Sequence, residues 1–284
     1  MRRGQGYGYA PSGGGTRFFE SAVPLVLIVI LAVFIAGKLG VVDFSEVPVL
    51  NSVFPAPKTV VAVVGRSSAT MRDLMASEDF RALGVYFAGD IDQKVVYPGA
   101  LRNFDIVMAM GDPFCDRVAR KVIADRVKAG GKLIVIGDAC TRVNDDRSAV
   151  GWDIGIGSLG DVMPVKIGGV SHELDPWVTA PVTGKLKIVE VDHPMFNGVK
   201  NFQFNSVITG ITVPTTNSNI LAYVDSSSIG IPTRPALFAI IESRGLLAGK
   251  VIYYAYDPST MAQFQQTGRN MFLNALLYLR GAKG

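Results

Sequence analysis

The sequence predicts an α/β protein with a flavodoxin-like, mostly parallel sheet and helices on both faces, preceded by one N-terminal transmembrane helix. Between residues 59 and 137, short β-branched or apolar runs alternate with helical segments. That spacing requires right-handed crossovers between parallel strands. An uncharged apolar stretch precedes these runs. Together with the apolar residues that follow it, the stretch is long enough to cross a bilayer, which takes roughly 20 residues.

The composition supports one large domain, or two small ones, with a membrane contribution. The chain has 284 residues, of which 49% are hydrophobic and 18% charged. The formal net charge is +4, but no basic stripe with interleaved aromatic residues is visible, so we expect no nucleic-acid partner. The 2 cysteines exclude a disulfide-rich scaffold and a Cys-rich zinc module.

The first 58 residues are expected to form three segments. Residues 1–20 are rich in Gly and Tyr and predict a disordered arm. Residues 21–42 predict the transmembrane helix, with Ala22 to Val42 in contact with the lipid bilayer. Residues 43–58 carry prolines and predict a stiff juxtamembrane linker. A cleaved signal peptide is the alternative, but the run is long for one and lacks a convincing cleavage site.

The charges around the apolar run predict its orientation. Basic residues precede it and acidic residues follow it, namely Arg2, Arg3 and Arg17, then Asp43 and Glu46. By the positive-inside rule, the amino terminus lies in the cytoplasm. We therefore expect a single-pass protein of the cell membrane whose main domain is extracytoplasmic.

Residues 59–284 are expected to form the α/β domain, which begins with a β-branched run ending in Gly, typical of a buried first strand. Its first part predicts strands over Thr59–Gly65, Gly84–Ile91 or Lys94–Tyr97, Asp105–Gly111 and Lys132–Gly137, and helices over Ser67–Leu83 and Pro113–Ala129.

The second part is less regular. Thr141–Gly169 is rich in Gly and Asp and predicts a long excursion over the carboxyl edge of the sheet. Further strands, partly antiparallel, are expected over Gly184–Val191, Ser206–Thr212, Ile220–Val224, Pro235–Glu242 and Gly249–Tyr256, with a last helix over Asn270–Leu279.

The segments FDIVMAMG, AGGKLIVIG, DHPMFNGV and GKVIYYAYDP, followed by NMFLNALLYL, occur in an order that resembles the class I glutamine amidotransferase-like superfamily. The resemblance covers about Thr59 to Arg280. It is nearest to the non-amidotransferase branches, namely trehalose-utilisation-type domains and the related domains of ABC-transporter accessory proteins and of a eukaryotic oligosaccharyltransferase subunit.

The resemblance implies a Gly-x-Cys-x-Gly elbow after Lys132–Gly137 and a His-Pro-Glu motif after Val251–Tyr256. In this sequence the elbow reads GDACTR, so that Cys140 comes one residue late, and Asp257 begins the Asp-Pro-Ser that stands in place of His-Pro-Glu. A thiol without an imidazole lacks the base that would activate it. Cys140, Asp257 and His193 are the catalytic candidates, and we favour a protein that is not an enzyme and needs no cofactor.

Three interpretations of Cys140 stay open: a structural thiol, a nucleophile, or a disulfide with Cys115. The disulfide follows from the expected position of both residues just beyond the carboxyl ends of neighbouring parallel strands, in an oxidising compartment.

Several aspartates crowd the same predicted edge, among them Asp112, Asp138 and Asp153. Such a cluster is suited to bind a cation or a sugar, and the alternative is a solvated loop. His172 lies beside Glu173, but one histidine with nearby carboxylates is a common surface arrangement, so no metal site is expected.

These features favour an accessory or scaffold subunit of a membrane complex, with membrane-protein partners. The alternative is a surface-tethered hydrolase, or a carbohydrate-binding or carbohydrate-processing domain, that uses Cys140 and the Asp-rich edge.

Overall fold

The computed structural model describes residues 27–32, 58–155, 158–167, 179–209, 212–225, 236–244 and 249–281. The chain divides into two compact units, Met1–Pro57 and Lys58–Gly284. In the first unit, residues 27–32 are helical and their side chains are exposed. None of the helices in the described residues is both long enough and apolar enough to cross a membrane. The remainder of the predicted span at 21–42, like the predicted arm and most of the predicted linker, lies outside those residues.

The second unit is built on a large sheet. Its strands are β1 (Thr59–Gly65), β2 (Val85–Ile91), β3 (Ile106–Met110), β4 (Lys132–Ile136), β8 (Thr179–Ile188), β9 (Phe202–Thr209), β11 (Ser218–Asp225), β12 (Ala236–Ser243) and β13 (Lys250–Tyr254). Two small separate sheets pair β5 (Arg142–Val143) with β6 (Asp146–Val150) and β7 (Val165–Ile167) with β10 (Thr212–Pro214).

The nine strands of the large sheet lie in the order β2-β1-β3-β4-β13-β12-β11-β8-β9. All pairings from β2 to β13 are parallel, and all pairings from β13 to β9 are antiparallel. The sheet is therefore mixed, and the prediction of a mostly parallel sheet holds for one half of it. The parallel half has the flavodoxin-like order, in which successive strands are added to one side of β1 and then, from β3 on, to its other side.

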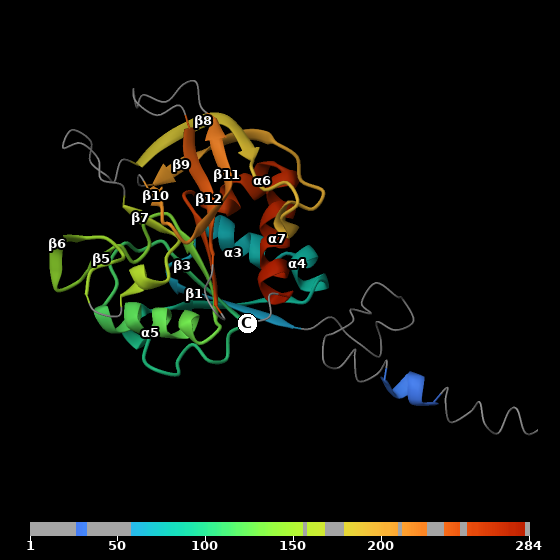
Figure 1. Ribbon diagram of the computed structural model, residues 1–284, viewed down its shortest axis with the longest axis horizontal. Coiled ribbons are helices and arrows are strands. Elements are labelled where there is room, and N and C mark those ends of the chain that lie inside the picture. Colours follow the sequence, from blue (N-terminus) through green and yellow to red (C-terminus); the bar gives the residue numbers. More distant parts are fainter. Residues whose placement is uncertain are drawn as a thin grey trace, which may run out of the picture. The chain divides into compact units, whose positions relative to one another are not determined.

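Helices cover both faces of the parallel half (Figure 1). They are α3 (Ala69–Met75), α4 (Glu78–Ala82), α6 (Pro258–Phe264) and α7 (Gln266–Gly281) on one face and α5 (Arg117–Lys128) on the other. The single helix predicted over Ser67–Leu83 is two helices, because Ser77 becomes the N-cap residue of α4. Its hydroxyl also donates a 2.7 Å hydrogen bond to the carbonyl of Leu74, at the end of α3.

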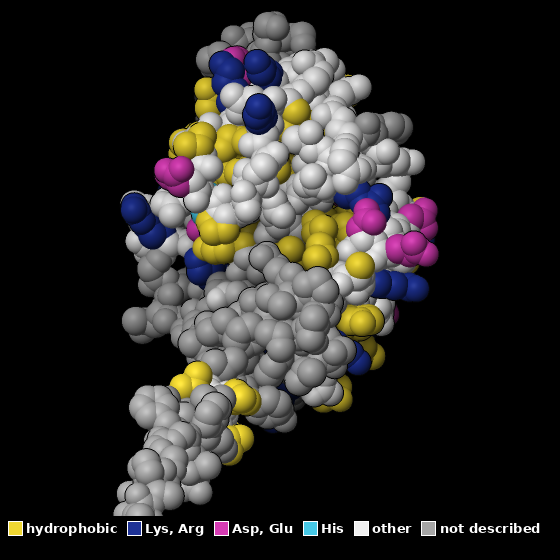
Figure 2. Space-filling view, turned by 90° about the vertical axis from the view of Figure 1, so that its right-hand side faces the viewer, with side chains coloured by type: hydrophobic (Ala, Val, Ile, Leu, Met, Phe, Trp, Pro, Cys, Tyr) yellow, Lys and Arg dark blue, Asp and Glu magenta, His cyan; other side chains and the backbone are white. Residues whose placement is uncertain are grey.

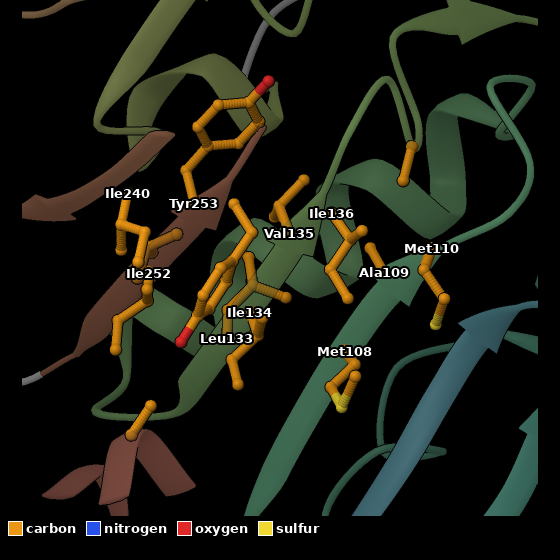
Figure 3. Packing of buried hydrophobic residues seen from close by; sticks show 14 of the residues in the cluster. Met108, Ala109, Met110, Leu133, Ile134, Val135, Ile136, Ile240, Ile252 and Tyr253 are labelled. Atoms are coloured by element: carbon orange, nitrogen blue, oxygen red, sulfur yellow. The ribbon is translucent and has the colours of Figure 1, made fainter. Parts of the chain in front are cut away.

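The core lies on both sides of β3 and β4, in which every residue is buried. Figure 3 shows side chains of β3, β4 and β13 packed side by side across the sheet. In β13, successive tyrosines point to opposite faces: the ring of Tyr253 packs at 5.6 Å from Trp152 and that of Tyr254 at 6.1 Å from Phe272. This double burial explains why the strands read as continuous apolar runs.

The antiparallel half of the sheet curves strongly. β9 is the edge strand of the antiparallel half, yet its residue Ile208 forms an isolated bridge with Tyr256, just beyond β13. Ser206 of β9 and Thr260 of α6 also share a hydroxyl hydrogen bond of 2.7 Å. The end of β9 therefore returns to the start of α6.

On the side of the molecule that carries α4 and α7, described hydrophobic side chains and charges of both signs are interspersed (Figure 2). The described surface in that view has no extended basic area.

Candidate functional site

The candidate site lies at the carboxyl edge of the parallel strands, where the order of the sheet reverses between β1 and β3. In open α/β sheets, ligands bind in the crevice outside the strand ends at such a switch point. Here the loops that follow β1 and β3 touch, since the N–H of Arg66 donates to the carbonyl of Met110 at 3.1 Å.

Two glycines allow this contact between the loops. Gly111 has φ +75°, and a Cβ added to it would lie 1.9 Å from the carbonyl oxygen of Arg66. Gly65 has φ +111°, and its added Cβ would lie 2.3 Å from the carbonyl oxygen of Met110. Only glycine satisfies both the left-handed backbone and the close approach.

A cleft of about 420 Å³ opens at this point. Its lining comes from the loops after β1, β2 and β3 and from the segment after β5: Gly65, Arg66, Asp90, Asp92, Gln93, Lys94, Asp112, Phe114 and Asn144. The lining is polar and carries charges of both signs, which is the lining expected for a hydrophilic ligand rather than an apolar one.

The cleft's carboxylates are already held by the protein. Asp112 accepts hydrogen bonds from the N–H of Phe114 at 2.9 Å and from Nε2 of Gln93 at 2.7 Å. The side chain of Asp92 accepts from the N–H of Lys94 at 2.9 Å and begins the short 3₁₀ helix Gln93–Val95. These contacts fix where the carboxylate oxygens point.

The third carboxylate, that of Asp90, is shared between two donors. Its Oδ2 accepts from the N–H of Ser67 at 3.2 Å and lies 3.7 Å from Nη1 of Arg72. Since Arg72 is not part of the lining, the charge of Asp90 is offset from outside the cleft.

Of the aspartates predicted to bind a ligand, the structure brings Asp112 to the cleft. Asp138 is half-buried and close enough to Asp112 to interact electrostatically; burial is the main cause that raises the pKa of Asp138. Asp153 is exposed and does not line the cleft. His172 and its acidic neighbours lie outside the described residues.

Cys140 and Cys115 lie side by side beneath this edge. Both are buried free thiols, on segments joined by the Cys140 N–H bond to the carbonyl of Asp112 at 3.0 Å and the Cys115 N–H bond to the carbonyl of Arg142 at 2.9 Å. The pKa of the Cys115 thiol is raised strongly, first by its hydrogen bond with Cys140 and then by burial. Cys115 therefore stays protonated at neutral pH. The predicted disulfide between these residues stays a prediction.

Cys140 has a backbone φ of +57°, the only positive φ at a non-glycine residue in the described part of the chain. This is the kind of sparsely populated conformation that a nucleophile elbow requires. The residue, however, is only 3% exposed, so a substrate has no direct access to the sulfur.

Asp257, where the sequence resemblance implies an imidazole, is the N-cap residue of α6. One carboxylate oxygen accepts from the N–H and the hydroxyl of Ser259 at 2.9 and 2.6 Å, and the other accepts from the hydroxyl of Ser68 at 2.7 Å. Since Ser68 is the N-cap residue of α3, Asp257 joins the starts of two helices. Both of its oxygens take part in structural contacts.

His193 lies at the opposite, amino-terminal edge of the parallel strands. Its Nδ1 accepts a 3.3 Å hydrogen bond from the N–H of Met195. Its Nε2 lies 3.5 Å from the buried carboxylate of Glu242, which also accepts from Tyr278 at 2.7 Å and lies 3.2 Å from Nζ of Lys250, the first residue of β13.

The three catalytic candidates therefore do not converge. Cys140 and Asp257 both follow strands of the carboxyl edge, but Cys140 contacts the layer of α5 through Cys115, while Asp257 contacts that of α3 and α6. His193 belongs to the other edge. A nucleophile and its base must come within hydrogen-bond reach, roughly 3 Å.

The sequence interpretation missed the cationic and amide side chains of the cleft, Arg66, Lys94 and Gln93. One signal was present: the Gly65-Arg66 pair immediately follows the first strand, where the switch point of a flavodoxin-like sheet is expected.

The strand order and the position of the cleft define an α/β protein of the flavodoxin-like type, and its structural neighbours fit a glutamine amidotransferase-like fold. No family model matches the sequence, and no curated protein matches it either.

Two solved structures carry the comparison of folds. A ThuA-like protein from Bacteroides uniformis ATCC 8492 is similar with a TM-score of 0.53 and 12% identity, over 79% of this chain and 92% of that one. A protein from Salmonella typhimurium, described as cytoplasmic, is similar with a TM-score of 0.50 and 15% identity, over 78% of this chain and 98% of that one. At these identities the similarity concerns the fold alone.

Proposed function

We propose that this protein is a membrane-anchored, non-catalytic amidotransferase-like domain that acts as an accessory or scaffold subunit of a membrane protein complex. The observation that carries this proposal is the separation of Cys140, Asp257 and His193 into three different environments. When the residues of a former catalytic edge cap helices and fill the core, the surface of that edge can change without any loss of catalytic activity.

The anchor in this proposal rests on the apolar run from Ala22 to Val42, which has the length of a membrane span. The arginines before it and the acidic residues after it favour a cytoplasmic amino terminus and an extracytoplasmic domain. A scaffold held at the membrane in this way needs only to bind, so its partners are membrane proteins of the same complex.

Copurification tests the accessory role. Full-length protein, tagged at its carboxyl terminus and expressed at its native level, is extracted in mild detergent and separated by size. We expect membrane proteins to copurify in fixed stoichiometry. A chain lacking residues 1–42 serves as the control and should lose them. Recovery of the full-length chain as a clean monomer or homo-oligomer would contradict the proposal.

A second candidate function is a surface-tethered carbohydrate-binding or carbohydrate-processing domain. The open polar cleft at the switch point favours its binding version. A hydrolase version that uses Cys140 is less well supported, because the sulfur is buried and has no imidazole partner in the described structure.

A further inference from the structure

We infer that the cleft at the carboxyl ends of β1, β2 and β3 binds a small anionic polyol, a sugar that carries one phosphate or carboxylate group. The inference rests on the binding version of the second candidate function and names its ligand class. It is also compatible with the accessory role, because ligand binding requires no catalytic triad.

The anionic group is indicated by two cations that line the cleft. In the described part of the chain, the guanidinium of Arg66 and the ammonium of Lys94 make no hydrogen bond or ion pair. They reach the cleft from the loops after β1 and β2. Arg suits this task because its planar fork binds a phosphate or carboxylate through two parallel hydrogen bonds, and Lys adds a second positive charge.

The hydroxyl groups of the ligand are indicated by acceptors on the same walls. Nε2 of Gln93 donates to Oδ2 of Asp112 at 2.7 Å and so fixes that carboxylate in the wall of the cleft. Each carboxylate oxygen of Asp112 accepts one hydrogen bond from the protein and keeps further lone-pair capacity. Asp92 adds another carboxylate. The hydroxyl groups of a polyol can donate to these carboxylates, which a bare anion cannot do.

The balance of charge argues for a single anionic group. Arg66, Lys94, Asp92 and Asp112 line the same cleft, while Asp90 is offset by Arg72 from outside. The cleft is thus close to neutral, and a polyphosphate would meet repulsion from the aspartates. Its volume, about 420 Å³, is at the lower end of small-ligand sites, which suits a monosaccharide.

Isothermal titration of full-length protein in detergent micelles tests the inference. The probes are the 6-phosphates and the uronates of glucose, galactose and mannose, with the neutral sugars and inorganic phosphate as controls. We expect binding of at least one charged sugar, at least tenfold tighter than its neutral form and than inorganic phosphate. Whether phosphates or uronates bind identifies the anionic group.

The variants Arg66→Ala and Lys94→Ala should each weaken that binding roughly tenfold, the value of one charge-assisted hydrogen bond. The matched variants Arg81→Ala and Lys200→Ala remove exposed charges elsewhere and should bind as the parent does. Urea unfolding shows whether each variant is folded.

Three results would overturn the inference: no charged sugar binds, inorganic phosphate binds as tightly as the sugar phosphates, or binding is unchanged in Arg66→Ala and Lys94→Ala. None of these results bears on the accessory role, which copurification tests separately. Conversely, a failed copurification with intact sugar binding would leave the ligand assignment in place.

Discussion

Replacing Glu242 by alanine is expected to lower the free energy of unfolding by about 3 kcal/mol, near the lower end for breaking a buried ion pair. The side chain of Glu242 is 4% exposed and lies 3.2 Å from Lys250, whose side chain is 31% exposed. Without the carboxylate, the hydroxyl of Tyr278 loses its acceptor and the ammonium of Lys250 keeps only the oxygen of Tyr278. Partial access of Lys250 to water moderates the cost. Urea unfolding of the full-length protein measures the loss.

Glutamine at position 242 separates charge from hydrogen bonding. Glu242→Gln keeps an acceptor for Tyr278 and should cost less than Glu242→Ala. Glu190→Ala, which removes an exposed carboxylate after β8, should change stability by no more than about 0.5 kcal/mol. Equal, small losses in all three variants would show that the buried cluster does not stabilise the fold.

The same carboxylate makes stability depend on pH. Burial raises the pKa of Glu242. Hydrogen bonds with His193 and Tyr278 and the charge of Lys250 lower it by more than burial raises it, so the pKa lies below the ordinary value of 4.5. Because the pKa is lower in the folded state than in the unfolded state, the ionised carboxylate stabilises the fold above the unfolded pKa. This stabilisation is lost as the pH falls through the folded pKa. The parent should therefore lose stability below pH 4.5 more steeply than Glu242→Gln.

Gly111→Ala is expected to cost on the order of 3 kcal/mol, as the sum of left-handed strain, a backbone clash and a lost hydrogen bond. At φ +75°, the new Cβ would meet the carbonyl oxygen of Arg66 at 1.9 Å. The loops after β1 and β3 must then separate, which breaks the bond from Arg66 to Met110. Because these loops form the cleft, sugar binding should weaken with stability.

Gly198→Ala is the matched control, because Gly198 has a similar φ of +69° but nothing within 4 Å of an added Cβ. It carries the left-handed strain alone, about 1–2 kcal/mol. If both variants lose the same free energy of unfolding, the contact between the two loops contributes nothing.

The strands of the parallel half could be predicted from the sequence because their burial on both faces makes them continuous apolar runs. Thr59–Gly65 is observed with the predicted bounds, β3 is one residue shorter than predicted at each end, and β4 is one residue shorter at its carboxyl end. The break between α3 and α4 escaped prediction because Ser77 is polar and compatible with a helix interior, so only its cap geometry reveals the boundary. The small strands β5, β6 and β7 in the long excursion after Cys140 carried no apolar period.

The candidate site could be predicted only where residues directly follow a strand. Asp112 was found in this way, and so was the proximity of Cys115 to Cys140. The sequence could not show that His193 lies at the opposite edge, since this depends on the direction in which β8 enters the sheet through three antiparallel pairings. Nor could it show that Asp257 bonds to Ser68, 189 residues away.

Thiol labelling tests the central claim, that the carboxyl edge of the sheet carries no reactive cysteine. Folded full-length protein is treated with iodoacetamide, and peptide mass spectrometry follows Cys115 and Cys140 before and after denaturation, with and without reductant. We predict that neither residue is labelled in the folded protein and that both are labelled after denaturation, with reductant if they form the disulfide. Rapid labelling of Cys140 in the folded protein would contradict the account.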